Sequence, residues 1–316
     1  MAILKRILLA VAVIAMAAAC GCLSVLAAPY FIGPDKCLKC HKPEESVWEG
    51  TKHAKSFKDV HRAPEAKAIL DAAGGEPNMR RNDVCVGCHY SLVQTDANAK
   101  PNAVDGPSCE SCHGAASDWI DVHNDGAKPG ETAEHKADRI HKSIQAGMIR
   151  PEMLYDIAEN CLSCHELSHA GKKGAIPPET FAKMIDAGHP AGTSFELVQY
   201  SQGTVRHRFY PPDVSKNAEM TPAQLARMYI TGQAAALVTT STAEGKINNA
   251  KYQETVSKVQ AGAKTALNAI KDQVPEAAAL LTQPSDDNAR KLVEAISNKD
   301  LSPQVSSLLP APSTYK

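Results

Sequence analysis

The chain has 316 residues, which is enough for two ordinary domains or one extended domain. Its formal net charge is −1, so no strong field favours a nucleic acid or an acidic substrate as partner. Aromatic residues make up only 5% of the chain, whereas it holds 12 histidines and 10 cysteines. This balance excludes an ordinary aromatic-rich core and suggests that large groups other than side chains fill part of the interior.

The N-terminal segment, residues 1–28, is predicted to be a signal peptide or a membrane or lipid anchor. Lys5 and Arg6 precede an uncharged apolar run over residues 7–28, which is the pattern of a secretory signal. Three interpretations stay open: cleavage ahead of Ala28, lipidation at Cys20, and an uncleaved anchor long enough to cross a bilayer. Each one predicts export to the periplasm or the cell surface.

The next feature along the chain is a C-x-x-C-H motif, which occurs four times. This is the attachment signature of a c-type haem, in which two thiols bond the porphyrin and the histidine binds the iron. A single copy would also suit a redox dithiol or half of a zinc site. Four equal spacings favour four covalently bound haems. The predicted attachment residues are Cys37, Cys40, Cys85, Cys88, Cys109, Cys112, Cys161 and Cys164, and the predicted proximal ligands are His41, His89, His113 and His165.

Eight further histidines could supply a second axial ligand to each iron. Four of them are predicted as distal ligands: His53 beyond a helix that starts near Pro43, His123 shortly after the third motif, His189 at the end of a helix over 176–190, and His207 between two arginines. His123 is the expected partner of His113, because only ten residues separate them. The weaker candidates are His61, His135, His141 and His169.

The rest of this half reads as short helices and loops. Helices are predicted over residues 63–75, 131–147 and 151–160, the last leading into Cys161. Residues 91–107 are rich in Asn, Asp and Pro and are predicted to hold little regular structure. Because this loop is short, the haems at His89 and His113 are expected to lie close together. Arg206 or Arg208 is a candidate partner for haem propionates.

Composition changes after Pro212, where cysteine and histidine stop and alanine becomes frequent. Helical periodicity predicts helices over 224–240, 248–272 and from Asp286, the first opened by a Thr221-Pro222 cap. We therefore divide the chain into a predicted tetrahaem cytochrome domain, 29–212, and a helical C-terminal domain, 213–316, with a packing, docking or oligomerisation role.

These motifs resemble the tetrahaem cytochrome c-554 family, which is related to the haem core of the hydroxylamine oxidoreductases. The resemblance rests on CLKCH followed by Trp48 and TKHAK, on CVGCH, on CESCHG with His123 after it, and on the fourth motif with His189 beyond. It covers residues 30–210 approximately and implies a mainly α multihaem cytochrome c fold with little regular sheet, wrapped round four haems. It also implies His53, His123 and His189 as distal ligands.

The same resemblance implies that the haem at His89 lacks a distal protein ligand in the founding member. His207 is an addition in this chain and is the expected residue for that place. Two functions follow: an electron carrier with redox-protein donor and acceptor, which histidine on both faces of each iron favours, or an enzyme whose open haem at His89 reacts with a small nitrogen species. The chain has no C-x-x-C-K motif, which favours the carrier. Self-association, with a neighbouring chain's histidine completing a haem, is a third option.

Overall fold

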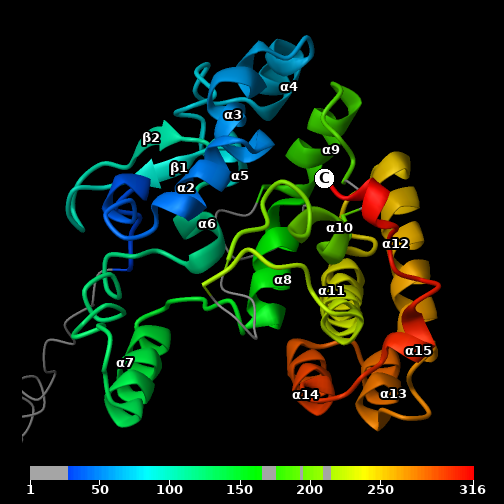
Figure 1. The fold of residues 1–316 in the computed structure, drawn as a ribbon. Helices are drawn as coiled ribbons and strands as arrows, with labels where there is room; N and C mark the ends of the chain where they lie inside the picture. The colour runs from blue at the N-terminus through cyan, green and yellow to red at the C-terminus, as the bar shows by residue number, and fades with distance from the viewer. Residues whose placement is uncertain (1–27, 166–175, 193–194, 209–214) are drawn as a thin grey trace, which may run out of the picture.

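The computed structural model describes residues 28–165, 176–192, 195–208 and 215–316, and it is mainly helical (Figure 1). The predicted signal or anchor and His169 lie outside the described residues. None of the described helices is long and apolar enough to cross a membrane. The elements before the middle of the chain are η1 Pro34–Lys36, α2 Lys42–Glu49, α3 Lys52–Asp59, η2 Val60–Arg62, α4 Ala66–Ala73, α5 Asp83–His89, β1 Ser91–Val93, β2 Asn102–Asp105, α6 Cys109–His113, α7 Ala133–Gln145 and α8 Leu154–His165.

The helix predicted from Pro43 is divided in two at Thr51. The Thr51 hydroxyl accepts a hydrogen bond from the backbone N–H of Ala54 at 3.2 Å and so caps α3. A residue that caps a new helix stands outside helical geometry, so α3 leaves in a different direction from α2. The break places His53 in the first turn of α3.

Residues 91–107, predicted to be an irregular loop, contain a small antiparallel hairpin of β1 and β2. Its register pairs Ser91 with Asp105 and Val93 with Asn102. Ser91 is fully buried, and its hydroxyl donates to the carbonyl of Gly106 at 2.8 Å. The hairpin therefore brings the end of α5 close to the start of α6.

Helix α8 is longer than predicted and continues through the fourth motif to His165. Beyond it the elements are α9 Pro178–Asp186, α10 Leu197–Ser201, α11 Pro222–Ala243, α12 Ala250–Asn268, α13 Pro275–Thr282, α14 Asp286–Ile296, α15 Ser302–Val305 and η3 Pro312–Thr314. Helices α10, α13 and α15 were not predicted, because runs of four to eight residues are too short to show helical periodicity.

Helix α11 is the centre of the C-terminal half. Thr221 and Gln224 form a capping box at its start, as the Thr-Pro pair predicted. Thirteen of its 22 residues are buried, and it contacts α8, α10, α12 and α14. Small side chains such as Ala234 and Ala235 let these neighbours approach closely from several sides.

One apolar core joins α8 and α10 to the C-terminal helices. Leu162 of α8 and Leu197 of α10 share it with Leu237 and Leu292, and all four are at most 2% exposed. Figure 1 shows α8 with α6 on one side and α11 on the other, in agreement with the contacts of these helices. The helix that carries the fourth motif is thus built into the C-terminal core.

Candidate functional site

Each C-x-x-C-H motif lies on one helical turn. The second, third and fourth motifs end α5, α6 and α8. The first motif forms a turn of its own, closed by a hydrogen bond of 3.0 Å from the N–H of His41 to the carbonyl of Cys37. A helical turn places residues i, i+3 and i+4 on one side, so two thiols and an imidazole can face the same group. All eight motif cysteines are free of disulfide bonds.

Every predicted proximal histidine faces one predicted distal histidine. The two ring centroids are 5.9–6.4 Å apart in all four pairs. Metal–nitrogen bonds of about 2 Å, plus about 1 Å from each nitrogen to its ring centre, place such centroids roughly 6 Å apart. The spacing therefore fits one iron between each pair. The pairs are His41 with His123, His53 with His165, His89 with His189, and His113 with His207.

Two pairings differ from those expected. His123 was expected opposite His113, but it faces His41 at 6.4 Å. His123 is the last residue of a turn, in which its own backbone N–H donates to the carbonyl of Trp119 at 2.9 Å. Arg139 of α7 donates to the His123 carbonyl. These contacts direct the imidazole away from its own motif, so proximity in sequence was the wrong criterion.

His207 was expected opposite His89, but the structure places it at 6.3 Å from His113. The position opposite His89 is taken by His189, at 6.2 Å. The last pair, His53 with His165, joins the first turn of α3 to the end of α8 at 5.9 Å. The four histidines that face the motif histidines were predicted from the sequence, but which histidine faces which was not. The pairing is decided by packing between segments that are distant in the chain.

The second ring nitrogen of several of these histidines is already hydrogen-bonded. Nδ1 lies 2.9 Å from a backbone carbonyl in His113 (to Ile149), His189 (to Pro190) and His207 (to Val205). His123 makes the same kind of contact with Ile120. An imidazole that donates through Nδ1 leaves Nε2 as the free lone pair, and such a bond orients the ring toward a metal.

Burial lowers the pKa of several of these imidazoles and so favours their neutral form. It lowers the pKa of His89 to about 4, with a smaller contribution from His189. Burial, and next the charge of His53, lowers the pKa of His165 to about 4. The pKa of His53 and that of His113 are also lowered, again mainly by burial. Neutral imidazole is the form that binds a metal ion.

The four pairs form two groups in space. His41 and His207 both act on the pKa of His113, and the side chain of Cys109 hydrogen-bonds that of Cys37. His53 and His89 both act on His165. These contacts join the first motif to the third and the second to the fourth, and the hairpin of β1 and β2 joins the second to the third.

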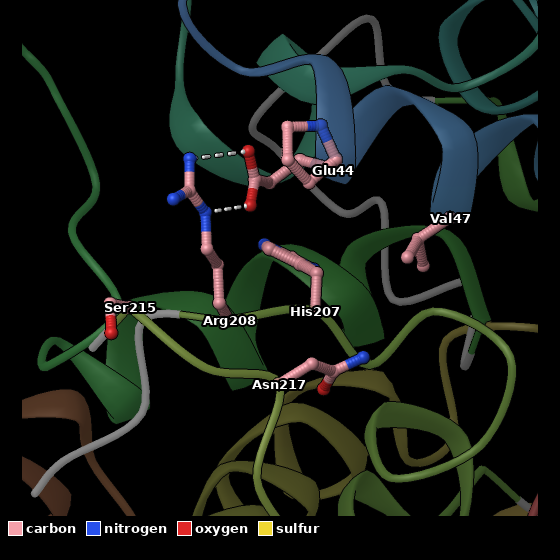
Figure 2. Close-up of a pocket in the computed structure, with 7 residues that line it drawn as sticks. Glu44, Val47, His207, Arg208, Ser215 and Asn217 are labelled. Atoms are coloured by element: carbon pink, nitrogen blue, oxygen red, sulfur yellow. Dashed lines mark hydrogen bonds and ion pairs between the residues drawn. The ribbon is translucent and has the colours of Figure 1, made fainter. Parts of the chain in front are cut away.

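The site at His207 borders an open pocket of about 210 Å³, shown in Figure 2. Arg208 donates from its guanidinium to both carboxylate oxygens of Glu44 on α2. Burial raises the pKa of Glu44, but the hydrogen bonds and charge of Arg208 outweigh it, so the net pKa is lowered. The pocket is lined by Pro43, Glu44, Val47, His207, Arg208, Ser215 and Asn217.

The two arginines predicted to meet propionates have protein partners. Arg208 is paired with Glu44, and Arg206 donates from Nε to Asn217 Oδ1 at 3.2 Å and lies 3.8 Å from Glu219. Arg208 therefore ties the chain beside His207 to the helix that follows the first motif. This agrees with the grouping of the first and third motifs.

Aromatic rings support the paired histidines, and sequence reasoning missed this role. The ring of Trp119 lies 5.2 Å from that of His123, and Phe195 and Tyr200 lie 4.8 and 5.3 Å from that of His165. Phe181 lies 5.8 Å from His189. Trp119 precedes its histidine by one helical turn and Phe181 by two, and this spacing is the signal that could have found both.

A buried carboxylate ties the start of the described chain to the third motif. Glu110, the residue after Cys109, is 0% exposed. Its Oε1 accepts hydrogen bonds from the N–H groups of Ile32 at 3.0 Å and Ala116 at 2.8 Å, and its Oε2 accepts one from Gly33 at 2.8 Å. Three donors satisfy most of the acceptor capacity of the group, which makes its burial tolerable.

The remaining histidines in the described ranges lie at the surface. His61, His135 and His141 are exposed, and His135 Nδ1 contacts Glu131 at 2.8 Å. Within the described residues, no three His, Cys, Asp or Glu side chains converge as they would round a zinc ion. The ligand chemistry of the described chain is therefore concentrated in the four facing pairs.

Comparisons with known proteins relate the chain to one family. A family model described as "Cytochrome c554 and c-prime" matches residues 36–114. The cytochrome c-554 of Nitrosomonas europaea is 31% identical over 169 residues, which is 50% of this chain and 67% of that protein. The chain belongs to the cytochrome c-554 family. It is therefore a c-type cytochrome with covalently bound haem and a role in electron transfer. No solved structure matched the chain.

Proposed function

We propose that this cytochrome c-554 family member is an exported tetrahaem electron carrier that passes electrons between redox proteins by hopping from haem to haem. The observation that carries the proposal is the four facing histidine pairs at 5.9–6.4 Å, each joined to one C-x-x-C-H motif. Haem bound there would supply a one-electron iron couple. The eight motif cysteines would hold four haems, and the eight paired histidines would bind four irons.

The chain's own residues do three things in this function. The helical turns of the motifs fix where each haem is attached. The paired imidazoles would hold each iron, which would favour low potentials and exclude small ligands. Contacts such as Cys37 with Cys109 bring different motifs together, so that electrons would have short distances to cross. Carbonyls and aromatic rings hold the imidazoles, which limits movement when the iron changes charge.

The alternative function was an enzyme with an open haem at His89. It needs a free position opposite that histidine, and His189 lies there with ring centroids 6.2 Å apart. We therefore favour the carrier. The facing pairs all lie within one chain, so closing the irons needs no histidine from a second copy. Export rests on the N-terminal sequence pattern and on the chemistry of haem attachment.

The deciding experiment is spectroscopy of the purified holoprotein. We expect a mass that corresponds to four haems, and only low-spin signals in electron paramagnetic resonance of the oxidised form. The reduced protein should not bind carbon monoxide. A haem in four that is high-spin and binds the gas would overturn the carrier proposal, and a mass with fewer than four haems would overturn the tetrahaem assignment.

A further inference from the structure

The direction of His189 depends on how α9 is held. The backbone N–H of His189 donates to the carbonyl of Met184 at 2.9 Å, and the backbone N–H of Gly188 donates to the carbonyl of Ile185 at 3.0 Å. These are the two bonds of a Schellman motif, with Gly188 at φ +107° in the left-handed region that favours glycine. His189 is thus rigidly attached to the end of α9, and any movement of the helix moves the imidazole.

An aromatic chain connects this helix to the C-terminal half. Phe181 of α9 is 2% exposed, and its ring lies 5.8 Å from that of His189. On its other side it meets Tyr252 of α12 edge to face, at 5.8 Å and 88°. Tyr252 is 1% exposed. Packed rings of this kind have no free volume in which to shift, so the position of Tyr252 determines that of the imidazole.

A polar contact also joins α9 and α12, at the start of α12 and the end of α9. Asn249 accepts a hydrogen bond from the N–H of Tyr252 at 3.2 Å and so caps α12. Its amide group also donates to Asp186 at 2.9 Å, at the C-terminal end of α9. One side chain therefore caps α12 and ties it to the last residue of α9, three residues before His189.

Helix α9 is held from both sides. It contacts α4, and a Cβ on Gly188 would lie 3.0 Å from Glu65, just ahead of α4. One apolar cluster contains α9 residues together with Ile247 and Val256 of the C-terminal half and Ile69 of α4. In Figure 1, α9 lies between α4 and α12. Removing α12 would leave α9 supported on one side only.

We propose that Tyr252 and Asn249 are positioning residues, through which the C-terminal helices hold His189 opposite His89 and keep that iron closed to small ligands. This rests on the proposed ligation of the iron by both histidines. A metal–nitrogen bond of about 2 Å is lost when its ligand is displaced by roughly 1 Å, so a small shift of α9 is enough to open the site. The C-terminal helices thereby decide whether this cytochrome only carries electrons.

The test uses the full-length holoprotein, with carbon monoxide as the probe of open haem and electron paramagnetic resonance as the second readout. His189→Ala is the reference and should open one haem in four. Tyr252→Ala should raise the carbon monoxide-binding fraction at least tenfold over the parent protein. Tyr252→Phe keeps the ring against Phe181 and should retain the parental spectrum. If Tyr252→Ala does not fold, Asn249→Ala should also raise the carbon monoxide-binding fraction, by a smaller amount.

The control is Leu280→Ala in α13, at a residue that is 0% exposed and belongs to the other core. It should loosen the C-terminal helices and leave all haems low-spin. If His189→Ala opens no haem, the ligation of this iron and the inference both fail. If His189→Ala opens one haem but Tyr252→Ala and Asn249→Ala open none, only the inference fails. Equal opening in Leu280→Ala would show general loosening and would also overturn it.

Discussion

The two halves of this molecule fill their interiors by different means. All of the largest fully buried side chains lie at Leu162 or beyond it in the described sequence, and most of them belong to the C-terminal helices. The described residues before α8 have one small apolar cluster, around Ala66, Met79 and Tyr90. That region contains three of the four motifs and five of the eight facing histidines. His41 and His123 face each other, and the other three face histidines in α8 and beyond, all at ring-centroid distances that fit one metal ion.

This difference indicates what each half needs in order to fold. The C-terminal helices, together with α8 and α10, have an extensive apolar core of their own. The N-terminal half does not, and the bound haems would supply the missing apolar contacts and the cross-links between segments. When a cofactor completes the core, binding free energy becomes folding free energy. The low aromatic content of the chain has the same explanation.

The largest effect should come from removing the attachment residues. In a variant with all eight motif cysteines replaced by alanine, we expect residues 28–160 to lose nearly all hydrogen-exchange protection. Helices α11, α12 and α14 should remain protected, because Cys161 of α8 is the one motif cysteine that packs against their core in the described part of the chain, and it is only partly buried. Hydrogen exchange followed by mass spectrometry measures both halves in one sample.

Cys20 and Cys22 provide the matched control, since they lie outside the motifs. In the uncleaved chain, replacing both by alanine should leave the protection of residues 28–160 unchanged. A cysteine-free chain in which residues 28–160 stay as protected as in the parent would show that the N-terminal half folds without haem, and the comparison would no longer hold.

The second effect concerns the apolar core. Leu292 of α14 is 0% exposed, and Leu292→Ala should lower the free energy of unfolding of the C-terminal helices by about 2–5 kcal/mol. The haem absorption bands should not change, because Leu292 lies on α14, whose residues include no motif cysteine and no paired histidine. Denaturant titration followed by circular dichroism gives the free energy, and optical spectroscopy follows the haem.

The adjacent Lys291 is exposed and serves as the control. Lys291→Ala should change the free energy of unfolding by less than about 0.5 kcal/mol. If the haem absorption of Leu292→Ala is lost at the same denaturant concentration as its helical circular dichroism signal, the two halves unfold as one unit.

The smallest effect tests the polar contacts of the N-terminal half. Glu110→Gln keeps one carbonyl acceptor but turns an amide donor toward backbone N–H groups, so it should cost about 1–3 kcal/mol. The loss should appear in hydrogen exchange at Ile32 and Gly33, which the carboxylate holds. Glu134→Gln, at an exposed position of α7, should have no effect. Equal exchange in both variants would show that the haem alone holds this segment.

The sequence of this cytochrome predicts which residues face one another better than it predicts how they are paired in space. Four motifs of equal spacing predict the attachment residues, and the surplus of histidines led to His53, His123, His189 and His207, each of which faces a motif histidine. The partners could not be predicted, because loops of such length allow several arrangements. Local signals decided only the ends of elements, such as the Thr221 cap of α11.

The residues that sequence reasoning missed act across long distances. Tyr252 looks like any apolar position of α12, and only its contact with Phe181 relates it to a ligand. Glu110 looks like a surface carboxylate within a motif, yet it is completely buried against Ile32 and Gly33. Neither role has a periodic pattern, since each depends on where a distant backbone segment lies.

The facing pairs have an order that concerns how the chain is assembled. Their first members are His41, His53, His89 and His113, and their second members follow in the same order as His123, His165, His189 and His207. In the proposed ligation every pair therefore bridges the segment 114–122. A single proteolytic cut there would leave two fragments still joined through four irons, and no iron would gain its second ligand until translocation had passed that segment. In that ligation the four haems would be overlapping cross-links, each closing a loop of roughly a hundred residues.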